Sequence, residues 1–261
     1  MPYVLTSHDP LWSDCSFHWQ QISKKLAPYA ETATALLVEP IIQGVTGMKL
    51  YSKDLLCRLR EWCTQHNVHL IADEIMTGLG RTGKMLAVQY ADIEPDFLCL
   101  GKGLTGGWAA LSAVLTNDKI YQIFYDDHAA DKAFLHSHTY AGNALATSIA
   151  FEVLTIVQEL NLAERAQQLG NIMYQHMLAI AEETNMLTQV RHIGAIVAAD
   201  LVSDNTDDRL AYRIYQKAVT LGALLRPLGN TIYWLPPLTT EFTVIDELSR
   251  ITRAALLSYR Q

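Results

Sequence analysis

The fold class is indicated most clearly by residues 69–107, HLIADEIMTGLGRTGKMLAVQYADIEPDFLCLGKGLTGG. Two short apolar runs stand out, 69–75 and 97–101: Asp73 and Glu74 lie at the end of the first, Lys102 follows the second, and glycines come after both. Runs of this length that alternate with helical patterns are typical of parallel strands joined by crossover helices. Ligands bind beyond the carboxyl ends of such strands, so Asp73 and Lys102 are expected to face one crevice.

The flanking sequence extends the same pattern. The runs 35–41 and 111–116 are further strand candidates, and 52–67 is predicted to be a crossover helix with Ser52 as its N-cap. Two long helices are predicted over 142–160 and 161–183. These elements favour an α/β fold with a mostly parallel sheet and helices on both faces.

Shorter periods begin near residue 187 and indicate a smaller α+β domain. The predicted elements are a strand over 192–201, a helix over 207–222, short strands at 224–228 and 231–237, and a closing helix over 244–260. We therefore predict two domains, a larger one over residues 1–186 and a smaller α+β one over residues 187–261.

Composition excludes several classes of function. The 261 residues carry a net charge of −7 with scattered Lys and Arg, so no nucleic-acid surface is expected. No apolar run approaches the roughly 18 residues of a membrane span, and the start does not read as a secretory signal. The four cysteines show no spacing typical of a metal site. We expect a cytoplasmic protein with small-molecule partners and no metal.

Position alone leaves an ordinary explanation open for both site candidates: Asp73 could cap a turn, and Lys102 could be a solvated surface lysine. The surroundings of Lys102 argue against the second explanation, because four glycines within residues 101–107 let backbone approach a ligand closely. The glycines at 78, 80 and 83 do not form the GxGxxG fingerprint, and no GxxxxGK[ST] loop or GxSxG elbow is present.

Four motifs together resemble one family. They are VEPIIQGVTG (38–47), DEIMTGLGRTG (73–83), LCLGKGLTGG (98–107) and HSHTYAGNALA (136–146). In this order they resemble the class III, fold-type I aminotransferases, which use pyridoxal phosphate. The resemblance implies that residues 1–186 are part of the cofactor-binding large domain of that fold. Within the class, the chain is most similar to the adenosylmethionine-8-amino-7-oxononanoate aminotransferases of biotin synthesis. Met76 supports that branch, because ornithine-type and 4-aminobutyrate-type relatives usually carry Gln there.

The resemblance implies a role for each matching residue. Lys102 would form a Schiff base with the cofactor, touch the substrate and act as general base, while Asp73 would hold the pyridine nitrogen. Thr139 would contact the cofactor phosphate across a dimer interface, with His138 beside it. A catalytic amine works near neutral pH only when its pKa falls from about 10.4 to about 7–8, which burial and nearby cofactor chemistry must supply.

Two further positions would contact substrate. Arg226 would bind the substrate carboxylate, which suits its planar two-pronged donor, and Ser137 would contact substrate through its backbone. The substrates implied are S-adenosylmethionine and 8-amino-7-oxononanoate. Another class III aminotransferase that acts on an ω-amine stays open as an alternative.

The resemblance also implies that this chain lacks a match to the family's upstream segment, which supplies a Gly-Ser turn for the phosphate. Because anion binding at helix ends needs several converging N–H donors, we expect weak activity from this chain alone. We expect a truncated or split gene product that forms a homodimer or joins a complementing N-terminal chain, and a non-catalytic assembly subunit remains the rival hypothesis.

Overall fold

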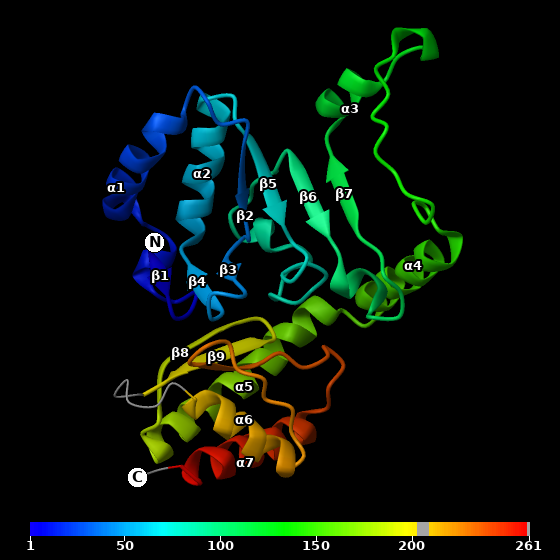
Figure 1. Cartoon of the computed structure of the whole chain (residues 1–261). Coiled ribbons are helices and arrows are strands. Elements are labelled where there is room, and N and C mark those ends of the chain that lie inside the picture. Colours follow the sequence, from blue (N-terminus) through cyan, green and yellow to red (C-terminus); the bar gives the residue numbers. More distant parts are fainter. Residues whose placement is uncertain (203–208, 260–261) are drawn as a thin grey trace.

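The computed structural model describes residues 1–202 and 209–259, and they form two lobes (Figure 1). The upper lobe holds a four-stranded sheet in the order β2-β5-β6-β7, and the lower lobe holds a three-stranded sheet in the order β10-β9-β8. Five short 3-10 turns join other elements: η1 (Pro10–Trp12), η2 (Ala27–Tyr29), η3 (Ala87–Tyr90), η4 (Lys102–Thr105) and η5 (His128–Ala130).

The upper sheet consists of β2 (Ala35–Val38), β5 (His69–Asp73), β6 (Phe97–Leu100) and β7 (Ala113–Thr116). Strands β2, β5 and β6 are parallel, whereas β7 runs antiparallel to β6. All four predicted strands are confirmed, each within the predicted run, and the mostly parallel sheet is confirmed with them.

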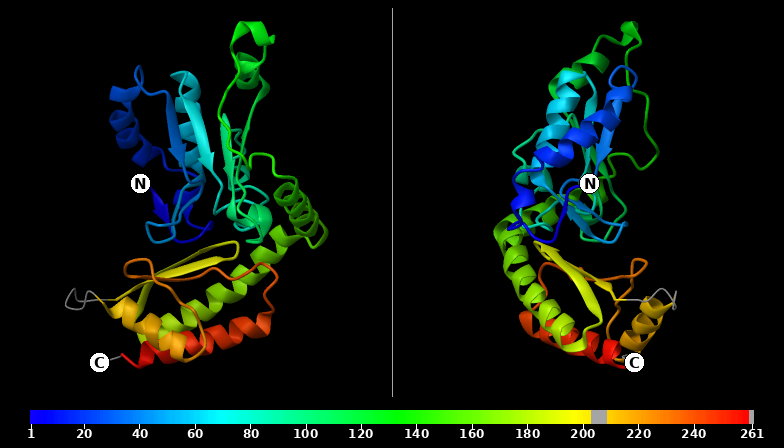
Figure 2. Two further views of the ribbon diagram at one scale, coloured as in Figure 1. Left: turned by 45° about the vertical axis from the view of Figure 1, so that its right-hand side comes forward. Right: turned by 90° about the vertical axis from the view of Figure 1, so that its left-hand side faces the viewer.

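Helices α1 (Ser16–Leu26) and α2 (Lys53–Gln65) lie on one face of this sheet (Figure 2). Leu70 and Leu98 point to that face and are buried, because side chains alternate along a strand. The opposite face is left open by the described helices, and Leu37 there is 63% exposed. Ser52 takes the predicted N-cap position of α2, but its hydroxyl donates to Trp12 O at 3.0 Å instead of capping the helix.

A small antiparallel sheet lies at the lower end of this lobe. It consists of β1 (Tyr3–Val4), β3 (Ile42–Gln43) and β4 (Lys49–Tyr51), in the order β1-β4-β3. These strands and α1 were not predicted. The strands have only two or three residues each, too few for a periodic pattern, and α1 carries just three partly buried apolar residues, Trp19, Ile22 and Leu26.

After β7 the chain leaves the lobe as an arm, which we define as residues 125–143, and Figures 1 and 2 show it projecting upward and returning. It follows α3 (Asp118–Phe124) and leads into α4 (Ala144–Glu159), where the Asn143 side chain accepts from Ala146 N–H at 3.0 Å and caps the helix. Apart from η5, the arm contains no helix or strand.

The lower lobe contains α5 (Leu162–Thr184), β8 (Leu187–Ile193), β9 (Ile196–Leu201), α6 (Leu210–Thr220), β10 (Thr231–Trp234) and α7 (Phe242–Leu257). Its core gathers buried side chains from all six elements, so α5 packs with the C-terminal strands and helices. The domain boundary at residues 186/187 stays a prediction.

Two predicted strands of the lower lobe differ from the structure, the first in part and the second entirely. The run 192–201 is the end of β8 and all of β9, because Gly194 adopts φ +47 and reverses the chain. The run 224–228 forms no strand and contributes a single bridge, between Leu228 and Thr231. Residues 207–208 of the predicted helix lie outside the described residues.

In residues 1–202 and 209–259, no single helix is both long and apolar enough to cross a membrane. The pair α4 and α5 passes a test of length and composition only when it is combined across a 65° bend.

Candidate active site

Asp73 is the last residue of β5. It is half-buried on the open face of the sheet, and its Oδ1 accepts a hydrogen bond from Ile75 N–H at 3.0 Å. Its neighbour in the parallel register is Cys99 of β6. Burial and the negative charge of Asp73 raise the pKa of the Cys99 thiol. The carboxylate therefore has a defined orientation at the end of the strand.

Lys102 stands three residues beyond the register partner of Asp73, at the start of η4. Its φ of +42 is unusual for a residue with a side chain. Two glycines beside Lys102 seat this turn against the segment that follows Asp73. A β-carbon at Gly101 would lie 3.4 Å from Ile75 Cγ2, and one at Gly103 would lie 3.5 Å from Leu79 Cδ1.

The structure thus brings the Asp73 and Lys102 segments together at the carboxyl ends of neighbouring parallel strands. It does not bury the amine, because the Lys102 side chain is exposed. Burial within this chain, which the sequence analysis invoked, is not found.

Glu74 fixes the loop that follows β5. It is 1% exposed, and its carboxylate accepts hydrogen bonds from the Thr77 hydroxyl and from Val88 N–H, the latter at 2.9 Å. Burial raises the pKa of Glu74, although both hydrogen bonds act in the opposite direction. The loop is therefore folded back onto the strand that carries Asp73.

Arg81 ties this loop to the lower lobe, and sequence reasoning missed it. Its Nη1 donates to Ala195 O at 3.2 Å and to Pro236 O at 2.7 Å. Burial lowers the pKa of the guanidinium to about 10. Gln167 of α5 adds a second tie, because its Nε2 donates to Gly83 O at 2.7 Å.

Arg226 lies in the lower lobe, in the segment between α6 and β10. It is exposed, and it lines a pocket of about 340 Å³ together with Tyr233, Leu235 and Pro236. Because Arg81 holds Pro236 O, the pocket is connected to the loop that follows Asp73. Among the described residues, no carboxylate pairs with Arg226.

Ser137, His138 and Thr139 are all exposed on the arm. His138 Nδ1 accepts from Tyr140 N–H at 3.1 Å, and His138 lines a hollow of about 840 Å³ with residues 109–112. In the part of the chain that the structure describes, no hydrogen bond or ion pair joins these three residues to Asp73 or Lys102. The arm residues are thus separate from the strand-end site in a single chain.

Metal ligation finds no support in the described ranges, where no group of three or more His, Cys, Asp and Glu side chains could hold an ion. The strand-end site instead presents one carboxylate, one primary amine and glycine turns.

The sequence pattern of the family described as "Aminotransferase class-III" matches residues 2–256. The chain belongs to this family. Its sequence is 41% identical over 219 residues to the adenosylmethionine-8-amino-7-oxononanoate aminotransferase of Helicobacter pylori. The aligned region covers 83% of this chain and 50% of that protein. It is 34% identical over 238 residues to the enzyme of the same name from Anoxybacillus flavithermus, which covers 88% of this chain and 52% of that protein.

Solved structures agree with this assignment. The adenosylmethionine-8-amino-7-oxononanoate aminotransferase of Methanocaldococcus jannaschii superposes with a TM-score of 0.84 at 31% identity, over 92% of this chain and 57% of that chain. An amine transaminase from an uncultivated Pseudomonas species, solved with PLP bound, superposes with a TM-score of 0.85 at 34% identity. The match covers 92% of this chain and 55% of that chain. The fold expected of a class-III aminotransferase is therefore confirmed. The chain spans about half the length of the curated relatives it matches.

Proposed function

We propose that this chain carries part of the active site of a pyridoxal-phosphate-dependent transaminase of biotin synthesis. The reaction transfers an amino group from S-adenosylmethionine to 8-amino-7-oxononanoate and gives 7,8-diaminononanoate. The observation that carries the proposal is the placement of Asp73 and Lys102 after two neighbouring parallel strands. The shared name of the curated relatives supports the choice of substrates.

The residues at this edge fit the cofactor chemically. A carboxylate suits the protonated ring nitrogen, and a primary amine suits the aldehyde, so Asp73 and Lys102 would hold the two ends of the ring. Thr139 would contact the phosphate, with His138 beside it. When bound, pyridoxal phosphate supplies an electron sink for the carbanion that transamination requires.

The chain's own groups would do the remaining work. Lys102 Nζ would act as the general base of a 1,3-prototropic shift: it would take the proton from the carbon that bears the amino group and return it two atoms further along. The hydrogen bond from Ile75 N–H fixes the orientation of the Asp73 carboxylate at the end of β5. Arg226 would clamp the substrate carboxylate with two parallel hydrogen bonds, and Ser137 would contact substrate through its backbone.

The exposed arm supports a role for a second polypeptide. Because Ser137, His138 and Thr139 lie away from Lys102 within one chain, we propose that they complete the site of a homodimer partner or of a complementing chain. We also propose a cytoplasmic location and a division into domains at residues 1–186 and 187–261.

A second candidate function is that of another class III aminotransferase acting on an ω-amine. The likeness to the acetylornithine aminotransferase of Elizabethkingia anophelis favours it, with a TM-score of 0.81 at 34% identity over 91% of this chain and 60% of that chain. A donor screen separates the two: transfer from S-adenosylmethionine supports the first, and transfer from ornithine-type donors alone supports the second.

Cofactor attachment tests the proposal directly. The chain incubated with pyridoxal phosphate should turn yellow, and borohydride should fix the label on Lys102, as mapped by peptide mass spectrometry. Lys102→Ala should lose the colour and the label. Lys119→Ala, which removes another exposed lysine, should keep both. A label elsewhere, or one that survives in Lys102→Ala, would contradict the proposal.

A further inference from the structure

Trp108 differs from the other four tryptophans of the chain. Trp12, Trp62 and Trp234 are buried and Trp19 is half-buried, whereas Trp108 is 85% exposed. A large aromatic side chain buries about 150–250 Å² when it is packed. This ring therefore has most of its stacking surface free for another molecule.

The backbone holds Trp108 away from the protein. Trp108 N–H donates to Thr105 O at 3.1 Å, which closes the turn that begins at Lys102. Gly106 and Gly107 precede it at φ +58 and +87, and a β-carbon at Gly107 would meet nothing within 4 Å. The space at Gly107 is thus open, and Trp108 belongs to the same turn as the candidate catalytic lysine.

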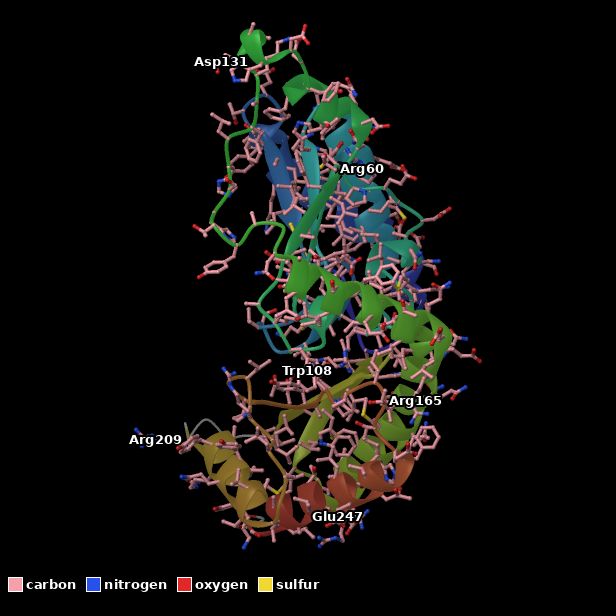
Figure 3. All side chains as sticks on the ribbon, turned by 90° about the vertical axis from the view of Figure 1, so that its right-hand side faces the viewer. Arg60, Trp108, Asp131, Arg165, Arg209 and Glu247 are labelled. Carbon is pink, nitrogen blue, oxygen red and sulfur yellow. The ribbon has the colours of Figure 1, made fainter. Side chains whose placement is uncertain are left out.

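Figure 3 shows Trp108 at the boundary between the two lobes. In Figures 1 and 2, the turn at the lower end of β6 lies close to the orange segment between α6 and α7. That segment carries Arg226 and two exposed apolar side chains, Leu224 at 78% and Leu235 at 37%. The ring therefore stands at the boundary of the two lobes, six positions after the candidate catalytic lysine.

We infer that Trp108 stacks on the purine ring of the amino donor and so selects an adenosyl donor over simple amino acids. This inference rests on the proposed function. The amino-acid end of S-adenosylmethionine must reach Lys102, which leaves its adenosine and its sulfonium cation to be held at the rim. Tryptophan stacks on any base and is the best aromatic partner for a cation. Ornithine and 4-aminobutyrate carry no ring that could use this surface.

Binding titrations of the cofactor-loaded chain test the inference, with S-adenosylmethionine, adenosine and methionine as separate probes. Trp108→Ala should lower the affinity for S-adenosylmethionine and for adenosine by at least about fivefold, which corresponds to the low end of the free energy of base–aromatic stacking. Trp108→Phe should lose less, and methionine affinity should not change in either variant. Phe17→Ala is the matched control, since Phe17 is also exposed, at 71%, but lies on α1.

The outcomes separate this inference from the proposed function. If borohydride places no label on Lys102 of the native chain, the proposed function is overturned. With labelling intact, an unchanged S-adenosylmethionine affinity in Trp108→Ala would overturn only the role of Trp108. An equal loss for methionine and S-adenosylmethionine would also overturn it, as would failure of the native chain to bind adenosine.

Discussion

Gly194 and Gly170 are needed because they have no side chain. A β-carbon at Gly194 would overlap the backbone of Thr82 and Arg81, and one at Gly170 would overlap Gly194 O. Backbone cannot move aside as the end of a flexible side chain can. The two lobes therefore meet here with main chain directly against main chain.

Gly194→Ala should destabilise the chain by at least about 3 kcal/mol, because overpacking against backbone adds to the strain of a left-handed residue. Urea unfolding followed by circular dichroism would measure the loss. Gly107→Ala is the control: its φ is +87 but its surroundings are open, so about 1–2 kcal/mol of backbone strain is expected. Similar losses in the two variants would show that the close approach is not what matters.

The residues of the site differ in how far sequence could predict them. Asp73 and Lys102 could be placed together because parallel strands share an edge, whatever the details of packing. Arg81 could not be assigned its contacts, because its acceptors are carbonyls 114 and 155 positions away. Backbone acceptors leave no trace in the identity of the residues that carry them.

Among the elements, the sheet was predictable and the turns around it were not. Strand β5 is an apolar run that ends at Asp73, strand β6 is one that is followed by Gly101 and Lys102, and both were predicted. The run 192–201 is equally apolar, but one glycine in its interior reverses the chain and makes a hairpin. The run 224–228 contains Pro227, whose missing N–H is unsuited to a strand ladder. Helix α1 has no fully buried residue, and only Trp19, Ile22 and Leu26 of it pack, partly buried, against the core.

Strand β8 should make stability depend on pH through His192. Burial, followed by the nearby His8, lowers the pKa of His192 to about 4, and its ring stacks on Tyr174 at 4.4 Å between centroids. Its Nδ1 has no hydrogen-bond partner. Since the unfolded pKa is about 6.5, stability is fully present above pH 6.5 and is lost as pH falls toward 4.

The loss should be on the order of 1–3 kcal/mol, at up to about 1.36 kcal/mol per unit of pKa difference. His192→Phe keeps a ring beside Tyr174 and should flatten the change in urea midpoint between pH 7 and pH 4. His128→Phe alters an exposed histidine on η5 and should leave the change in urea midpoint between pH 7 and pH 4 as it is in the native chain. If His192→Phe shows the same change in urea midpoint as the native chain, His192 is not the source of the pH dependence.

At the scale of the whole molecule, the arm should drive association. Phe134 and Leu135 on it are 68% and 89% exposed, more than is usual for such side chains on a monomer surface. The double variant Phe134→Ser and Leu135→Ser should weaken self-association at least about tenfold in sedimentation velocity runs over a range of concentrations. Its circular dichroism should not change, because neither side chain supports the core. Phe17→Ser should associate as the native chain does, and an effect of equal size there would argue for nonspecific stickiness.

Helix α4 links that arm to the rest of the chain. One of its ends continues from the arm, Ala150 in its middle packs with Leu104 of the Lys102 turn, and its other end leads into α5 across the 65° bend. A single helix thus contacts three parts of the molecule that lie far apart in the sequence. The position of the arm therefore depends on the same helix that packs against the Lys102 turn and continues into the lower lobe.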